Sequence, residues 1–146
     1  MKIEENFMNI FVRYFSRGGN TKKVAEAIAE ELGIEALDIT NAVEGADVLF
    51  LGSSMYAFTV DKNIKKFVSE LKSNNTKMIV NFSTSASDSS THKKVNKCVK
   101  DPNIQFYKEH FSIPGEFLKM NKGRPNEQDL KAAKEFARKV IEELSK

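Results

Sequence analysis

The chain has 146 residues, of which 40% are hydrophobic and 29% charged, and a net charge of +3; this balance is typical of one globular domain and excludes disordered and fibrous classes. A single cysteine cannot form an internal disulfide or, with two histidines, build a metal cluster, and no stretch approaches the ~20 apolar residues of a membrane span. We therefore expect one domain over residues 1–146, in the cytoplasm, without a metal site or membrane contact.

The first strand is predicted over residues 10–15, where apolar residues fall on both faces except at Arg13, as in a parallel strand that is covered on both sides. A helix follows at once, because apolar residues recur at every fourth position up to Leu32. Asn20 or Thr21 is expected to cap the start of this helix.

The rest of the chain alternates between short apolar runs, which predict strands, and apolar residues three and four positions apart, which predict helices. Asp61 is expected to cap the second helix, and Asn126 with Asp129 forms a capping pattern before the last one. In chain order, the pattern predicts strands over residues 34–39 and 48–51, a helix over 62–71, a strand over 78–82, a helix over 91–100, an edge strand over 104–111 and a final helix whose apolar stripe spans 130–144.

Five strands that alternate with helices indicate right-handed βαβ units, so the predicted fold class is α/β, with one doubly wound parallel sheet and helices on both faces. In such sheets, ligands bind at the carboxyl ends of the strands, where the strand order reverses. The segments that directly follow the first, third and fourth strands are therefore the candidates for a binding site.

The segment after the first strand reads Ser16-Arg17-Gly18-Gly19-Asn20-Thr21. Two glycines permit a nest of backbone N–H groups, side-chain hydroxyls and an amide add donors, and the following helix directs the positive end of its dipole there. A loop of this kind suits a phosphate group. It matches neither GxxxxGK[ST] nor GxGxxG, and a plain turn between strand and helix, with glycine used for its geometry, is the alternative interpretation.

Together with the helix that follows, this loop resembles the phosphate-binding loop and first helix of flavodoxins and flavodoxin-like proteins. The family usually reads Ser/Thr-x-Thr/Ser-Gly-Asn-Thr, so Gly18 stands where a hydroxyl is common, and charge from Arg17 is expected to compensate. Residues 52–58 and 82–88 are similar to the two loops that flank the flavin in this family, and residues 123–136 resemble its last helix. The resemblance covers nearly the whole chain and implies a single flavodoxin-like domain whose five strands are ordered 2-1-3-4-5.

The resemblance implies FMN as the cofactor, with its 5′-phosphate in the first loop and its ring between the other two loops. Tyr56 is the candidate for stacking on the ring. Because no aromatic residue lies between Phe82 and Phe106, the opposite face is expected to carry only small residues. No catalytic residue is assigned. The residues implied to contact FMN are Ser16, Arg17, Gly18, Gly19, Asn20 and Thr21 at the phosphate, Ser53, Ser54, Met55 and Tyr56 beside the ring, and Ser83, Thr84, Ser85, Ala86, Ser87 and Asp88 at its polar edge.

Three functions are open on this basis. The first is an FMN-binding electron-transfer protein that shuttles electrons between redox partner proteins. The enzyme alternative is an FMN-dependent NAD(P)H reductase of quinones or other small acceptors, favoured by a flavin face that only small residues cover. The third is a flavodoxin-fold interaction domain that has lost its flavin, favoured by the missing hydroxyl in the first loop.

The charge distribution indicates the kind of partner. Residues 61–100 carry 9 basic and 3 acidic residues, and the doubly wound order places the helices over 62–71 and 91–100 side by side, so one lysine-rich surface is expected. Such a surface favours an acidic redox partner or the phosphate of a nucleotide. Only four of the 23 basic residues are arginine, which argues against nucleic acid as a partner.

Overall fold

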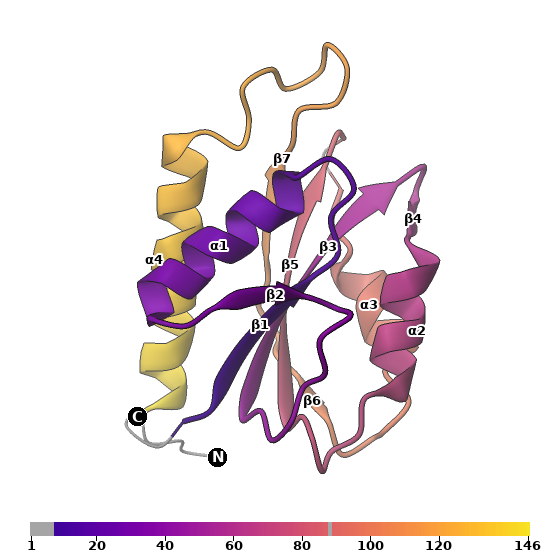
Figure 1. Ribbon diagram of the computed structural model, residues 1–146, viewed down its shortest axis with the longest axis vertical. Coiled ribbons are helices and arrows are strands. Elements are labelled where there is room, and N and C mark those ends of the chain that lie inside the picture. The colour runs from indigo at the N-terminus through magenta and orange to yellow at the C-terminus, as the bar shows by residue number, and fades with distance from the viewer. Residues whose placement is uncertain (1–7, 88) are drawn as a thin grey trace.

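The computed structural model describes residues 8–87 and 89–146 and contains one twisted sheet with helices on both of its faces (Figure 1). None of the helices in these ranges is both long and apolar enough to cross a membrane. In chain order the elements are β1 (Ile10–Tyr14), α1 (Asn20–Leu32), β2 (Ala36–Asp38), β3 (Val48–Tyr56), β4 (Thr59–Val60), α2 (Lys62–Glu70), β5 (Met78–Ser85), α3 (His92–Cys98), β6 (Gln105–Phe106), β7 (Phe111–Pro114) and α4 (Glu127–Leu144).

The strand order is β2-β1-β3-β5-β6, with every neighbouring pair parallel, which confirms the predicted doubly wound class and the order 2-1-3-4-5. Two short strands add to it: β4 pairs antiparallel with β3, and β7 pairs parallel with β5. The predicted edge strand over 104–111 is therefore wrong as one element, because it divides into β6 and β7. The break falls at Lys108, Glu109 and His110, which are exposed and polar.

Strands β3 and β5 both continue beyond the ends predicted for them, to Tyr56 and Ser85. Their polar ends pair in register, with Ser54 opposite Thr84. The prediction that residues 52–58 and 82–88 are loops is thus wrong for their first halves. The strands extend because hydroxyl side chains on neighbouring strands hydrogen-bond to each other, as Ser54 and Thr84 do at 3.0 Å.

Each face of the sheet has its own hydrophobic core, one under α1 and α4 and the other under α2 and α3 (Figure 1). The side chains of β3 alternate between them: Phe50 joins the first core, whereas Leu49 and Leu51 join the second. Helices α2 and α3 pack against each other, which confirms that they lie side by side.

The helix starts differ in how they are capped. Asp61 accepts a hydrogen bond from the backbone N–H of Asn63 at the start of α2, and Asn126 forms a capping box with Asp129 before α4, both as predicted. The predicted cap of α1 is wrong, because its N-cap is Gly19, in the left-handed conformation with φ 93°, and no side chain caps this helix. Its first N–H groups are therefore left for another acceptor.

Arg13 is only 5% exposed within β1. Its guanidinium donates to the carbonyl oxygens of Val12, Asn41 and Ala42 at 2.7–3.1 Å. These bonds attach the segment after β2 to β1 and satisfy the hydrogen-bond donors of the buried cation, whose charge Glu35 also stabilises.

Candidate functional site

A cavity of about 330 Å³ opens at the carboxyl ends of β1, β3 and β5, beside the point where the strand order reverses between β1 and β3. Four segments build its walls, and the one after β7 was not predicted to take part. The predicted residues that line the cavity are Arg17, Gly18, Asn20, Ser54, Met55, Tyr56, Thr84, Ser85 and Ala86. The further lining residues are Phe15, Ala57, Asp61, Gly115, Glu116 and Phe117.

Several other residues predicted to contact FMN direct their side chains away from the cavity. The hydroxyl of Ser53 donates to Thr91 at 2.9 Å, and that of Ser83 donates to Ser90 at 3.3 Å, so both side chains serve the junction between the sheet and α3. Ser87 is exposed and pairs its hydroxyl with its serine neighbours. Asp88 lies outside the described residues.

The start of α1 forms an anion site at one end of the cavity. The backbone N–H of Gly19 donates to Ser16 Oγ at 3.0 Å, which fixes the turn, and the first N–H bonded within the helix is that of Lys23. The three N–H groups between them, on residues 20–22, have no acceptor in the part of the chain that the structure describes. Free N–H groups and the helix dipole together favour a negatively charged ligand here.

Three hydroxyls form a closed triangle beneath this anion site. Thr21 Oγ1 lies 2.8 Å from Thr84 Oγ1 and 3.2 Å from Ser54 Oγ, and the last two oxygens are 3.0 Å apart. Thr21 and Thr84 are almost completely buried, whereas Ser54 is partly exposed and lines the cavity. The triangle joins α1, β3 and β5. Ser54 and Thr84 both line the cavity, and Ser54 is the more exposed of the two.

Two aromatic rings also wall the cavity. Tyr56 and Phe117 meet edge to face, with ring centroids 6.0 Å apart and an interplanar angle of 82°. Phe117 comes from the segment after β7, whereas the end of β5 contributes the small residues Thr84, Ser85 and Ala86 to the cavity. The expectation of a flavin face covered only by small residues stays a prediction. The signal for Phe117 in the sequence was the run Phe117-Leu118-Lys119-Met120, in which three of four residues are apolar although it lies between a strand and a helix.

Arg17 is placed against this aromatic wall. Its guanidinium carbon lies 5.0 Å from the centroid of the Tyr56 ring, and its Nε donates to the Asp61 carboxylate at 3.1 Å, with a second contact from Nη2. Arg17 thus pairs with Asp61 while it lines the cavity, and its compensation for the missing hydroxyl at the phosphate stays a prediction.

Asp61 is held in its charged form. Burial raises the pKa of its carboxyl, but hydrogen bonds from the backbone N–H of Asn63 and from Arg17 outweigh burial, so the pKa lies below the ordinary value of 3.8. At neutral pH this carboxylate therefore keeps Arg17 in place.

The segments after β1 and β7 are joined over the cavity. The side-chain amide of Asn20 donates to the carbonyl oxygen of Glu116 at 3.0 Å. A Cβ on Gly115 would lie 2.6 Å from the same amide nitrogen, so only glycine permits this approach.

The fold and the site together define an open doubly wound α/β protein with an anion site and an aromatic-walled cavity at its switch point. The chain belongs to the flavodoxin domain family, whose pattern matches residues 11–146.

The chain is similar to an uncharacterized protein of Methanocaldococcus jannaschii, at 31% identity over 84% of this chain and 90% of that protein. Among solved structures, a flavodoxin from the domain Archaea matches 95% of this chain and 100% of its own, with a TM-score of 0.74 and 19% identity. Oxidised flavodoxin 2 from Bacillus cereus matches 92% of this chain and 99% of its own, with a TM-score of 0.70 and 16% identity. These two structures share its fold.

Proposed function

We propose that this protein binds FMN and transfers electrons between redox partner proteins. The observation that carries the proposal is the uncapped start of α1, which opens into the same cavity that Tyr56 and Phe117 line. A ligand with a phosphate at one end and a planar ring at the other matches both features. Membership of the flavodoxin domain family supports the same cofactor.

The residues present fit FMN. The N–H groups of residues 20–22 and the hydroxyl of Ser54 would hold the phosphate, and the Tyr56 ring would stack on the flavin. Ser85 and Ala86, at the end of β5, would face the polar edge of the ring with backbone and hydroxyl groups. Bound FMN would supply one- and two-electron redox chemistry.

The aromatic wall would exclude water from one side of the ring. Phe117 packs edge-on against Tyr56 and fixes its orientation, while Arg17 and Asp61 close the wall at its outer border. These side chains would set the environment of the flavin.

The size of the cavity suits one flavin ring. At about 330 Å³ it lies at the lower end of the roughly 300–1,000 Å³ that small-molecule sites occupy. The NAD(P)H reductase and the flavin-free interaction domain remain as outcomes of the test.

The test is a fluorescence titration of the purified protein with FMN and, in parallel, with riboflavin, which has the same ring but no phosphate. We expect FMN to bind at one equivalent and riboflavin to bind much more weakly. No change in flavin fluorescence with either ligand would reject FMN binding and favour the interaction domain.

Stopped-flow mixing of the FMN-loaded protein with NADPH then separates the two redox functions. A carrier keeps its oxidised flavin spectrum with NADPH alone and loses it only when a reduced protein donor is added. Direct bleaching by NADPH would instead identify a reductase.

A further inference from the structure

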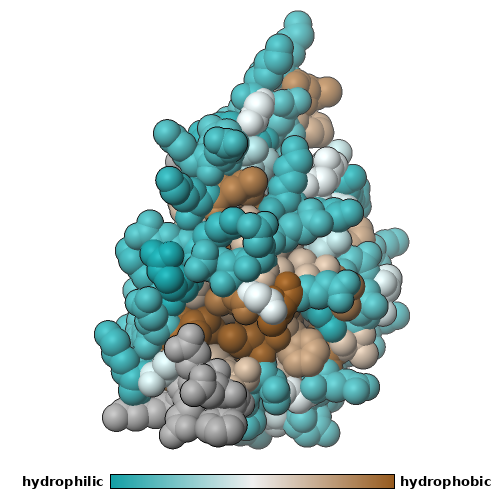
Figure 2. All heavy atoms as spheres, turned by 60° about the vertical axis from the view of Figure 1, so that its left-hand side comes forward, coloured by the Kyte–Doolittle hydropathy of each residue, from teal (hydrophilic) through white to brown (hydrophobic). Residues whose placement is uncertain are grey.

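Large apolar side chains that face solvent gather around the mouth of the cavity. Among residues 8–87 and 89–146 they are Tyr56, Phe58, Phe117, Leu118 and Met120, and the exposed fraction reaches 82% for Phe58 and Leu118. Figure 2 shows the same segregation, with apolar atoms just below a hydrophilic tip at the top of the molecule. Clustered exposure of this kind marks an interaction site more often than scattered apolar residues do.

The backbone at these positions holds the side chains outward. Ala57, Phe58, Leu118 and Asn121 have positive φ, between 49° and 64°, and they are the non-glycine residues with positive φ in the described chain. Ala57 and Phe58 form the two-residue turn between β3 and β4, where positive φ at both positions is the favoured hairpin geometry. Leu118 lies in the turn that Phe117 and Met120 close. The two turns thus present a phenylalanine and a leucine to solvent.

Hydrogen bonds within the chain hold the segment after β7 in place without a partner. Phe117 and Met120 exchange backbone hydrogen bonds of 3.1 and 2.9 Å, and the Glu116 carboxylate accepts from the N–H of Gly123 at 2.6 Å. The Asn121 side chain donates to the carbonyl oxygen of Ala86 at 2.9 Å, which attaches the segment to the end of β5. A surface that is already ordered loses little conformational entropy on binding.

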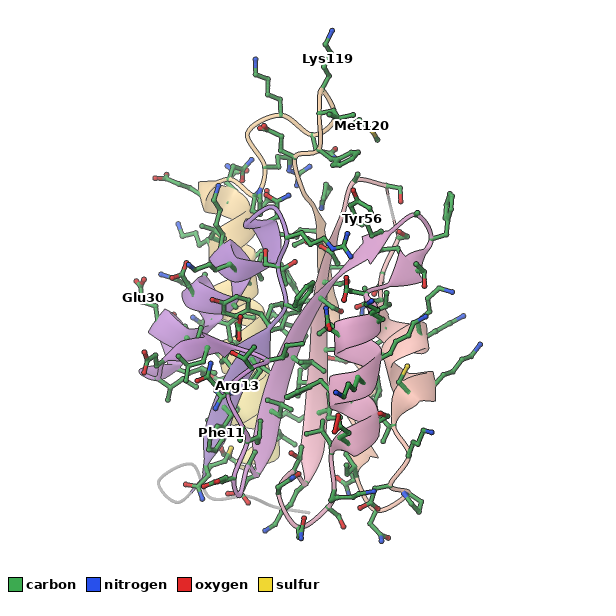
Figure 3. The ribbon with its side chains drawn as sticks, turned by 45° about the vertical axis from the view of Figure 1, so that its right-hand side comes forward. Phe11, Arg13, Glu30, Tyr56, Lys119 and Met120 are labelled. Carbon is green, nitrogen blue, oxygen red and sulfur yellow. The ribbon has the colours of Figure 1, made fainter. Side chains whose placement is uncertain are left out.

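Beside these apolar side chains, lysines outnumber the one described exposed acid of the segment after β7, Glu116, whose carboxylate accepts from Gly123. Lys119 and Lys122 are exposed, and neither forms a salt bridge within the described residues. Figure 3 shows Lys119 and Met120 at the tip of the projecting segment, beyond Tyr56. On the other side of the mouth, Lys65 reaches Thr59 at 3.2 Å, next to the turn that carries Phe58.

We propose that the mouth rim, made of Phe58, Phe117, Leu118, Lys119, Met120 and Lys122, docks an acidic redox protein that presents an apolar patch ringed by carboxylates. This inference rests on the proposed electron transfer, because docking at the rim would bring the partner's redox centre to the mouth of the flavin cavity. Charge complementarity sets the rate of approach, and the apolar side chains hold the complex once it has formed.

The test uses a plant-type [2Fe–2S] ferredoxin as the acidic probe and cytochrome c as the basic one. Binding is measured by calorimetry with and without FMN, and electron transfer by stopped flow from 20 to 300 mM salt. The charge variant is Lys119→Glu with Lys122→Glu, and the apolar variant is Leu118→Ser with Met120→Ser. The matched control, Lys131→Glu with Lys146→Glu, makes the same charge change at two exposed positions, in α4 and just after it, that form no salt bridge within the described residues.

We expect the charge variant to slow association with ferredoxin by roughly tenfold at low salt and to remove most of its salt dependence. The apolar variant should weaken ferredoxin binding by a similar factor at every salt concentration, while the control changes either quantity less than about twofold. Thermal unfolding shows whether each variant is folded.

Two results would overturn the docking surface: wild-type protein that binds ferredoxin no better than cytochrome c, or rim variants that behave like the control. A protein that binds no FMN would reject the proposed function but not the rim, because the calorimetric comparison of ferredoxin binding does not require flavin.

Discussion

Replacing Gly18 by threonine should strengthen FMN binding, because the structure leaves room for the hydroxyl that the first loop lacks. A Cβ built on Gly18 meets no heavy atom within 4 Å, and its φ lies outside the left-handed region, unlike that of Gly19 at 93°. Threonine at this position therefore adds a hydroxyl without strain in the folded chain.

The size of the gain follows from one added hydrogen bond to a charged group. Such a bond contributes about 1.5–3 kcal/mol, which corresponds to a Kd for FMN that is roughly 10- to 100-fold lower. A small rise in stability without ligand, about 0.4–1 kcal/mol, is also expected because threonine restricts the unfolded chain more than glycine does.

The assay is the same pair of fluorescence titrations, with Gly18→Ala as the matched control because it adds a Cβ but no hydroxyl. FMN affinity should rise for Gly18→Thr only, and riboflavin affinity should stay constant in both variants. An unchanged Kd for FMN would refute the argument, and an equal gain for riboflavin would show that the new side chain contacts the ring instead of the phosphate.

Three further predictions use the same protein. Arg17→Met should change the Kd values of FMN and riboflavin by the same factor, since the guanidinium stacks on an aromatic ring; a loss confined to FMN in the titrations would place it at the phosphate. Gly52→Ala should lower the free energy of unfolding in urea by about 1–3 kcal/mol or more, because its Cβ would lie 2.2 Å from the fully buried ring of Phe82; an unchanged midpoint would contradict this. Burial, and next the charge of His110, lower the pKa of His92 below its ordinary value of 6.5. Protonation of His92 therefore opposes folding. The stability that neutral His92 contributes is complete above about pH 6.5 and is lost as the pH falls through the lowered pKa. His92→Phe should flatten the fall in urea midpoint between pH 7.5 and 5, and a fall as steep as in the wild type would exclude His92 as its source.

The features that could be predicted from the sequence depend on local periodicity and on single residues at helix ends. The apolar residues of α2 and α4 recur three and four positions apart, and the caps Asp61 and Asn126 bond within the first turn of each helix. A short window of the sequence therefore contains the contacts that define where these helices form. The same holds for the glycine-rich turn after β1, which the structure places at the cavity as expected.

The features that could not be predicted depend on contacts between distant segments. Serine and threonine at the ends of β3 and β5 indicate loops locally, yet cross-strand pairing of Ser54 with Thr84 makes them strand. Likewise, Phe117 reaches Tyr56 only because β7 pairs with β5 in a register that puts Pro114 opposite Ser85. No local pattern contains that register.

The net charge of a segment is a poor guide to the field at the cavity mouth. Residues 101–146 carry 9 basic and 8 acidic residues and look neutral as a whole. Several of the acids are paired within α4 or near it, as Glu135 is with Lys139 and Glu143 with Lys108, so they do not offset the lysines of the mouth rim. Exposed charges are largely screened beyond about 10 Å at 0.1 M salt. In the proposed docking, the rim lysines therefore dominate the electrostatic part of the partner's approach, and the apolar side chains hold the complex once it has formed.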